Sequence, residues 1–362
     1  MNGDIPFGIL NTHFNCYWNS CLQSLYGLPV LTSLFCKDKV TKIIDKNEKS
    51  DEYNTKISAV FLKKYLKFIN IVDEKKETIT CILNPSSLLK PFFHLGAEIS
   101  AIIPGREEDA IEALTLIIEL MSRATVYDYT PRLTQDIKGA KNKTLYENYK
   151  SMQKEIEVFP YSVITPVFSG RFVVHSECTC CHHSTKRFES FSHITLHFDA
   201  EEDMGDTVRI NKMLRRYFRD EKTTRDNTVD CDYCHDKTRR IISKKILKLP
   251  YILIIQLGRF VYNRDAKKVD NDVEFPIDKP FNVEKYLDKD TNEVGSTYLL
   301  TSVIQHHGTT PRGGHYTALS KRGSSWYDFN DKKIRRIENQ DDKLFDSLDT
   351  TAYILMYTYS DD

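Results

Sequence analysis

The stretch that decides the fold lies near the start of the chain, where residues 8–23 read GILNTHFNCYWNSCLQ. The segment from Cys16 to Leu28 reads as a helix that opens at the cysteine, with Gly27 and Pro29 as its stop signals. A helix N-terminus carries partial positive charge, which favours a thiolate over a thiol. The sequence therefore predicts an activated cysteine, with a buried structural thiol as the alternative interpretation.

A second pattern lies near the other end of the chain, where residues 313–316 read GGHY and residues 326–331 read WYDFND. A cysteine, a histidine and an Asn or Asp far apart in sequence are what a papain-type nucleophile requires. The imidazole takes the proton of the thiol, and a third polar side chain fixes the tautomer of the imidazole. Cys16 and His315 are therefore the candidate nucleophile and base.

Both patterns resemble the signature boxes of the ubiquitin-specific proteases, a family of cysteine deubiquitinases. In the first box the chain keeps Gly8, Asn11, Cys16, Tyr17, Asn19, Ser20, Leu22 and Gln23, and it departs at His13, Phe14, Asn15 and Trp18. The second box is intact, and the resemblance extends from Gly8 to Tyr357. It implies an α+β, papain-like cysteine protease fold with thumb, palm and zinc-containing fingers. The order of helix-like segments before strand-like segments also favours α+β.

The resemblance implies roles for several side chains around the nucleophile. His315 is the base, and His306 is a neighbour of the site rather than a rival base. Asn330 stands at the position of the third triad member, and the adjacent Asp331 can substitute for it or help to polarise the site. Asn11 stands where the family places an oxyanion-hole side chain. A turn or cap asparagine is the alternative interpretation of Asn11.

Two Cys-x-x-Cys pairs form a second constellation, Cys178 with Cys181 and Cys231 with Cys234. Two short-loop thiolate pairs can build a tetrahedral structural Zn²⁺ site. Their separation is longer than in a compact zinc ribbon, but it fits hairpins pinned by zinc at the tip of the family's fingers. Free thiols or a redox pair are the alternative. Further candidate ligands close by in sequence are Cys180, His182, His183 and His235.

A third segment, residues 105–114, reads GREEDAIEAL and resembles the family's Gln-Gln-Asp-Ala-x-Glu-Phe box. Asp109 and Glu112 are three residues apart and share one helix face, where two carboxylates can pair with the arginines of the ubiquitin tail, Leu-Arg-Leu-Arg-Gly-Gly. Glu107 and Glu108 replace the family's glutamines. The alternative is an acidic first turn favoured by the helix dipole. The predicted ubiquitin-contacting residues are Asp109, Glu112, Gly313, Gly314 and Tyr316.

Composition limits the partners and the compartment of the protein. The 362 residues include 51 basic and 51 acidic side chains, a balance that argues against nucleic-acid binding. The start of the chain has no signal-peptide pattern, and the most apolar run, residues 251–257, is too short to span a bilayer. Nine cysteines indicate a reducing compartment with metal-binding or catalytic thiols. We therefore expect an intracellular protein, cytoplasmic or nuclear, with no membrane partner.

The sequence as a whole predicts one catalytic domain over residues 1–362, acting as a monomeric unit. We expect a helical thumb at about residues 1–165, fingers at 166–250 and a β-rich palm at 251–362. The expected reaction is thiol-dependent hydrolysis of the isopeptide bond after the C-terminal glycine of ubiquitin, which releases ubiquitin from proteins or chains. Two alternatives stay open: a protease for SUMO or another ubiquitin-like modifier, and a non-catalytic ubiquitin-binding scaffold.

Overall fold

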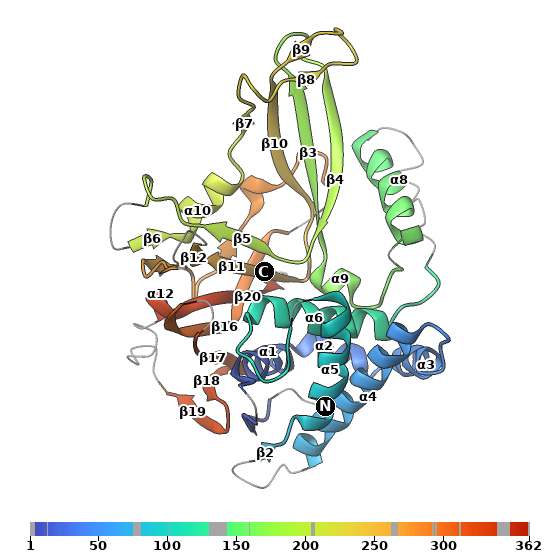
Figure 1. The fold of residues 1–362 in the computed structure, drawn as a ribbon, viewed down its shortest axis with the longest axis vertical. Helices are drawn as coiled ribbons and strands as arrows, with labels where there is room; N and C mark the ends of the chain where they lie inside the picture. Colours follow the sequence, from blue (N-terminus) through green and yellow to red (C-terminus); the bar gives the residue numbers. More distant parts are fainter. Residues whose placement is uncertain are drawn as a thin grey trace.

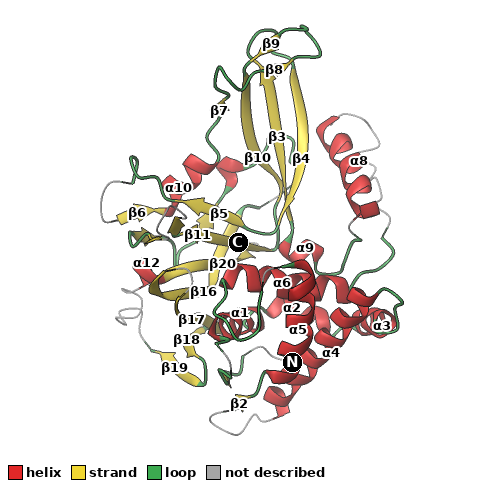
Figure 2. Ribbon diagram, in the orientation of Figure 1, coloured by secondary structure: helices red, strands yellow, loops and turns green. Residues whose placement is uncertain are grey.

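The computed structural model describes residues 4–12, 14–74, 81–100, 102–129, 143–158, 160–203, 207–261, 267–291, 293, 295–310, 313–338 and 348–360. The first part of the chain is helical, and its helices pack together at one end of the molecule (Figures 1 and 2). These helices are α1 (Cys16–Tyr26), α2 (Pro29–Phe35), α3 (Asp38–Asn47), α4 (Tyr53–Glu74), α5 (Ser86–Ile99) and α6 (Ala110–Ala124). Two short strands, β1 (Gly8–Ile9) and β2 (Ile82–Leu83), pair in parallel beside them.

Helix α1 is the centre of this helical region, because every one of its residues is buried. It begins at Cys16 as expected and ends at Tyr26, two residues before the predicted end at Leu28, with the stop signal Gly27 as its C-cap. Trp18 is fully buried and meets the ring of Phe92 of α5 edge-on, with 6.1 Å between ring centroids. A helix enclosed on all sides cannot shift without opening the core, so the position of its first residue is fixed.

A large sheet lies next to the helices and forms the β-rich palm (Figure 1). Its strand order is β19-β18-β17-β16-β20-β11-β5, and β15 pairs with β16. All of its pairings are antiparallel except β11 with β5. The strands are β5 (Ile194–His197), β11 (Ile252–Gly258), β15 (Phe281–Asn282), β16 (Thr297–Thr310), β17 (Gly313–Arg322), β18 (Ser325–Asn330), β19 (Lys333–Ile337) and β20 (Ala352–Ser360).

A second sheet of order β4-β3-β10-β7 projects from the molecule as the fingers (Figure 1). The strands are β3 (Gly170–Cys178), β4 (Ser184–Phe191), β7 (Glu221–Lys222) and β10 (Arg240–Lys248), and the tip carries the small pair β8 (Val229–Asp230) and β9 (Lys237–Thr238). Helix α8 (Lys143–Val158) stands beside this sheet, and α9 (Thr165–Phe168) lies at its base. Residues 166–250, the range expected to form the fingers, also include β5, which pairs with β11 in the palm sheet. This range therefore contributes strands to both sheets.

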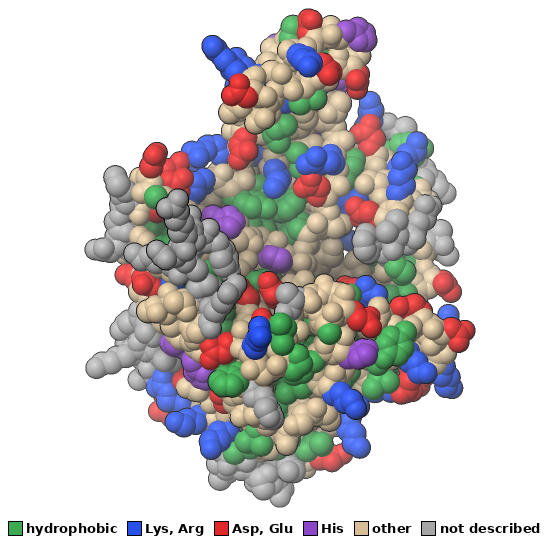
Figure 3. Space-filling model, in the orientation of Figure 1, with side chains coloured by type: hydrophobic (Ala, Val, Ile, Leu, Met, Phe, Trp, Pro, Cys, Tyr) green, Lys and Arg blue, Asp and Glu red, His purple; other side chains and the backbone are tan. Residues whose placement is uncertain are grey.

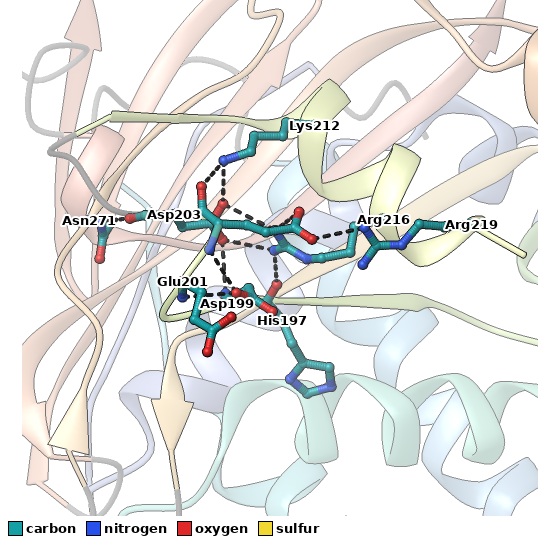
Figure 4. Close-up of polar contacts among 9 residues, drawn as sticks. His197, Asp199, Glu201, Asp203, Lys212, Arg216, Arg219 and Asn271 are labelled. Carbon is teal, nitrogen blue, oxygen red and sulfur yellow. Dashed lines mark hydrogen bonds and ion pairs between the residues drawn. The ribbon is translucent and has the colours of Figure 1, made fainter. Parts of the chain in front are cut away.

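The segment after β5 is fixed by a cluster of charged side chains (Figure 4). Asp203 is almost fully buried and accepts hydrogen bonds from Arg216 of α10 (Ile210–Tyr217) at 2.8 and 3.1 Å, and from Lys212 at 3.1 Å. Burial alone would raise the pKa of Asp203, but hydrogen bonds from Arg216, the Asp199 amide and Lys212 outweigh it and lower the pKa. The paired charges thus hold α10 against the end of β5.

Within the described parts of the chain, none of the helices has both the length and the apolar character that a membrane crossing requires.

Candidate active site

Cys16 and His315 meet where α1 packs against β17. Cys16 is the first residue of α1 and is 3% exposed. A hydrogen bond with Cys16 is the largest cause that raises the pKa of His315, to about 9, and burial of the imidazole opposes it. A hydrogen bond with Asn330 and the nearby charges of Cys16 and Asp331 add to the increase. The imidazole therefore holds its proton at neutral pH and can stabilise a thiolate beside it.

Asn330 orients the imidazole. Nε2 of His315 lies 2.9 Å from the side-chain oxygen of Asn330, which can only accept, so Nε2 is the donor. This arrangement leaves Nδ1 as the ring nitrogen available to Cys16. Asn330 is the last residue of β18, which pairs with β17, so the sheet itself sets the distance between the two side chains. The neutral amide fixes the ring without adding a buried charge.

Asp331 acts on different partners, although it is adjacent to Asn330. Its two carboxylate oxygens accept hydrogen bonds from the side-chain amides of Asn11 at 3.0 Å and Asn19 at 2.7 Å. Its backbone carbonyl accepts from the amide of Ile9 at 3.0 Å. Asp331 reaches these groups from the turn between β18 and β19, with a φ of 52°. The structure therefore places Asn330 on the imidazole and Asp331 on the segment that precedes the nucleophile.

The turn before Cys16 is built from asparagines. The amide N–H of Asn15 donates to the side-chain oxygen of Asn11 at 3.0 Å, and the Asn15 side chain donates to Asn19 at 2.8 Å. The Thr12 amide donates to the side-chain oxygen of Asn15 at 2.8 Å. Asn11 is thus a turn residue whose NH₂ group is also directed by Asp331. An amide nitrogen carries two hydrogens, so one bond to Asp331 leaves a second for an oxyanion.

Sequence reasoning did not find the roles of Asn15, Asn19 and Gly8. A Cβ atom on Gly8 would lie 2.7 Å from the carbonyl oxygen of Lys332, too close for any other residue without backbone movement. Gly8 therefore lets β1 approach the turn that carries Asp331. The sequence did single out Gly8 and Asn19, because both match the first signature box. Asn15 departs from that box, and no sequence pattern indicated its hydrogen bonds.

The other histidines on β16 are not placed as bases. His306 is buried, its pKa is lowered to about 4 by burial, and its ring centroid lies 4.7 Å from that of Tyr316. His307 shares a hydrogen bond of 2.8 Å with the hydroxyl of Thr317. Tyr316, predicted to contact substrate, is 3% exposed and belongs to the core behind the site. A direct contact from its ring would require the core to open.

The two glycines before His315 differ in how closely other atoms approach them. A Cβ atom on Gly314 would be 2.5 Å from Nε2 of His306 and 2.7 Å from the His307 carbonyl, so only glycine fits. The amide of Gly314 donates to the carboxylate of Glu107 at 3.0 Å. Gly313 has more room, because the nearest atom to its Cβ would be the Thr310 hydroxyl at 3.3 Å. Glu107 therefore connects the approach to α6 with the start of β17.

The two residues of the predicted acidic pair, Asp109 and Glu112, have different surroundings. Asp109 caps α6 by accepting from the Ile111 amide at 2.9 Å, and it accepts the Tyr353 hydroxyl on both oxygens, at 2.8 and 2.6 Å. Burial raises the pKa of Asp109 despite these bonds. Glu112 is exposed in the first turn of α6, and its pKa is raised by desolvation and by Asp109 and Glu108. Asp109 thus ties α6 to the palm strand β20, while Glu112 faces solvent.

Four cysteines meet at the tip of the fingers. The sulfurs of Cys178, Cys181, Cys231 and Cys234 lie within 4.8 Å of one another and could hold a metal ion. The two turns have matching backbone geometry. The amide of His182 donates to the Cys178 carbonyl at 3.0 Å, and the amide of His235 donates to the Cys231 carbonyl at 2.7 Å. Both histidines adopt a left-handed conformation, with φ of 58° and 59°.

The candidate alternative ligands lie outside the group of four cysteines. His182 pairs with Glu177 at 2.8 Å, and the ring of His183 stacks on Tyr233 with 4.8 Å between centroids. Cys180 is exposed and forms a second group with Asp236 and Cys234, the last of which it shares with the group of four. The four sulfurs match the all-thiolate donor set of structural zinc sites. These four cysteines therefore fit a thiophilic metal ion bound by four protein ligands in a closed site.

Known proteins match the chain over nearly its whole length. The family model described as ubiquitin carboxyl-terminal hydrolase matches residues 7–357. A probable ubiquitin carboxyl-terminal hydrolase of Acanthamoeba polyphaga mimivirus is 28% identical, with 98% of this chain and 90% of that protein aligned. Ubiquitin carboxyl-terminal hydrolase 36 of Drosophila ananassae is 25% identical over 97% of this chain, which spans 28% of the fly protein.

Among solved structures, the chain resembles a SAGA DUB module, Ubp8/Sgf11/Sus1/Sgf73, bound to monoubiquitin. The TM-score is 0.68 at 20% identity, with 99% of this chain and 70% of that chain covered. This likeness confirms the predicted α+β fold of the ubiquitin-specific proteases. The match of the family model over nearly the whole chain confirms the predicted class of enzyme. The chain belongs to the ubiquitin carboxyl-terminal hydrolase family, whose members are cysteine-type deubiquitinating proteases.

Proposed function

We propose that this deubiquitinase cleaves the isopeptide bond after the C-terminal glycine of ubiquitin with Cys16 as nucleophile. The observation that carries the proposal is the position of His315 between Cys16 and Asn330, which raises the pKa of the imidazole to about 9. The Cys16 thiolate attacks the carbonyl carbon, and His315 gives its proton to the leaving lysine amine. Water, deprotonated by His315, then attacks the thioester and releases the Cys16 thiolate beside the protonated imidazole.

Stabilisation of the oxyanion is assigned to Asn11 together with backbone amides near Cys16. The side-chain NH₂ of Asn11 is held by Asp331, and the turn that carries it is held by Asn15 and Asn19. Donors that are already oriented lose little energy on reorganisation when the negative charge develops. Asp331 is therefore a positioning residue, and Asn330 is the third member of the triad.

Replacing Asn330 by alanine should lower kcat by about 100-fold, because a displaced imidazole loses its reactive alignment. Replacing Asp331 by alanine should lower kcat by about tenfold. The loss is smaller than for removal of an oxyanion donor, because Asn11 stays in place and loses only the bond that orients it. Steady-state kinetics on a fluorogenic ubiquitin substrate would measure both. Asn330→Asp is the matched control and should retain most activity. A greater loss in the Asp331 variant would transfer the orienting role to Asp331.

The proposed substrates are ubiquitin chains and proteins to which ubiquitin is attached. The related solved structure is bound to monoubiquitin. Glu107 and Glu108 just before α6 and Glu112 in its first turn offer negative charge for a basic tail. Figure 3 shows hydrophobic side chains gathered at the base of the fingers, a surface suited to the body of a folded partner. Figure 3 also shows acidic and basic side chains interspersed, which supports a protein partner over nucleic acid.

A panel of warhead probes would test the modifier. Ubiquitin, SUMO and other ubiquitin-like proteins, each with an electrophile at the C-terminus, are incubated separately with the purified protein. We expect a covalent adduct with the ubiquitin probe, and no adduct in Cys16→Ala. Preferential labelling by SUMO would overturn the assignment of ubiquitin but keep the chemistry. Binding without any adduct would indicate a scaffold.

We further propose that the four-cysteine group holds structural Zn²⁺. Cys178, Cys181, Cys231 and Cys234 would bind it, and the ion would supply folding energy rather than chemistry at the active site. None of the nine cysteines, all of which lie among the described residues, forms a disulfide, which suits a reducing intracellular compartment. A monomeric unit in the cytoplasm or nucleus stays a prediction.

A further inference from the structure

Phe14 has an unusual conformation on the turn before the nucleophile. It lies two residues before Cys16, its φ is 54°, and its side chain is 59% exposed. A bulky side chain in the left-handed region is a true outlier, whereas asparagine and glycine tolerate that region. The signature box that this segment resembles has asparagine at the position of Phe14. The chain therefore keeps a strained aromatic residue where a better suited residue is available.

Stability does not explain the phenyl ring of Phe14. The ring is mostly in water, so it gains little from burial, while its backbone conformation carries a cost. The rest of the turn is tightly held, since Asn15 is fully buried and bonded to Asn11 and Asn19. These bonds fix the direction of the Phe14 backbone. Strain maintained by its surroundings beside an active site points to a function for the strained residue.

Two segments close to Cys16 differ in what they offer to a substrate. The approach to α6 is acidic, and Glu107 joins it to Gly314, the residue before His315. The turn with Phe14 is attached through Asn11 to Asp331 and carries an exposed aromatic ring two residues before Cys16. The acidic segment suits the basic ubiquitin tail, whereas the uncharged ring suits the aliphatic part of a leaving lysine.

We propose that Phe14 is a specificity-determining residue for the leaving group. Its ring packs against the aliphatic stem of the target lysine and the adjoining backbone of the protein that is released. Contact of a methylene chain with an aromatic face needs no charge and tolerates many target sequences. The proposal rests on the proposed function of Cys16, because it requires a lysine leaving group at that sulfur.

The test compares two substrates that share ubiquitin and differ in the leaving group. One is ubiquitin joined through an isopeptide bond to the lysine of a short peptide, and the other is ubiquitin ethyl ester, whose leaving group is ethanol. In Phe14→Asn and Phe14→Gly, kcat/KM for the lysine peptide should fall by about tenfold, the factor expected for a lost apolar contact. Ethyl ester hydrolysis should stay within about twofold of the wild-type rate. Phe14→Tyr keeps the ring and should retain both activities.

Thermal unfolding supplies a readout that is independent of activity. Relief of the left-handed strain should raise the melting temperature of Phe14→Asn and Phe14→Gly by about 2 °C. An equal fall for both substrates would mean that Phe14 only shapes the turn, and unchanged kinetics for the lysine peptide would also overturn the proposal. If the wild-type protein hydrolyses neither substrate, the proposed function itself fails, which is a different result from either of these.

Discussion

Cys16→Ala should abolish hydrolysis of diubiquitin and of fluorogenic ubiquitin substrates, with a loss of at least about 10⁴-fold in kcat. The reason is chemical, because alanine has no atom that can attack the carbonyl. Binding of ubiquitin should be largely unchanged, since recognition comes from a broad surface. Turnover of a set of diubiquitin linkages and calorimetric titration with ubiquitin would measure the two effects. The linkage set also shows which chains the wild-type enzyme prefers.

Cys36→Ala is the matched control for this variant. Cys36 is an exposed free thiol at the end of α2, outside the active site, so its loss should leave turnover intact. A second readout follows the imidazole of His315, whose raised pKa depends first on Cys16. In Cys16→Ala the pKa of His315, followed by NMR, should fall from about 9 toward its ordinary range. Normal turnover of a ubiquitin substrate by Cys16→Ala would end the assignment of the nucleophile.

The parts of the site that could be predicted from sequence are those encoded locally. Cys16 at the start of a helix needs only the helix pattern and its stop signals, and the two Cys-x-x-Cys pairs need only their short spacing. In both cases the chemistry depends on residues within one turn. The fold and the family could also be predicted, because the motifs occur along the chain in the same order as in the family, whose model matches residues 7–357.

The parts that could not be predicted depend on contacts between distant segments. Asp331 is 320 positions from Asn11, and only the folded sheet shows that it bonds to Asn11 rather than to His315. Asp109 and Tyr353 are 244 positions apart, and their bond buries a carboxylate that sequence reasoning assigned to the ubiquitin tail. Sequence spacing predicts which residues share a helix face, but not which partner covers that face.

The burial of Tyr316 is a different case, because the alternation of side chains along a strand could have predicted it from the sequence. Successive side chains of a strand point to opposite faces, so His315 and Tyr316 cannot both face the substrate. The structure shows this alternation, with His315 half-buried at the site and Tyr316 in the core. The conformation of Phe14 had no such signal, because a positive φ at a phenylalanine is set by the surrounding bonds.

The four-cysteine group is expected to decide whether the fingers fold. Among the described residues, neither apolar cluster of the protein includes a side chain from 173–190 or 219–245, so the finger tip has little core of its own. Strands as short as β8 and β9 are not stable by themselves. Four thiolates around one ion would supply the missing energy, because binding energy of a structural zinc is folding energy.

Replacing Cys178 by serine should therefore remove zinc, lower the melting temperature and raise KM for ubiquitin substrates. Elemental analysis should find about one zinc per wild-type chain, as one four-ligand site requires. A thioester of a ubiquitin-tail peptide should be turned over nearly normally, since the finger tip with β8 and β9 lies far from α1, the helix that begins at Cys16 (Figure 1). Cys180→Ser is the matched control, because Cys180 is exposed and outside the group of four. Wild-type protein without zinc but with normal thermal stability would show that these cysteines are not a metal site.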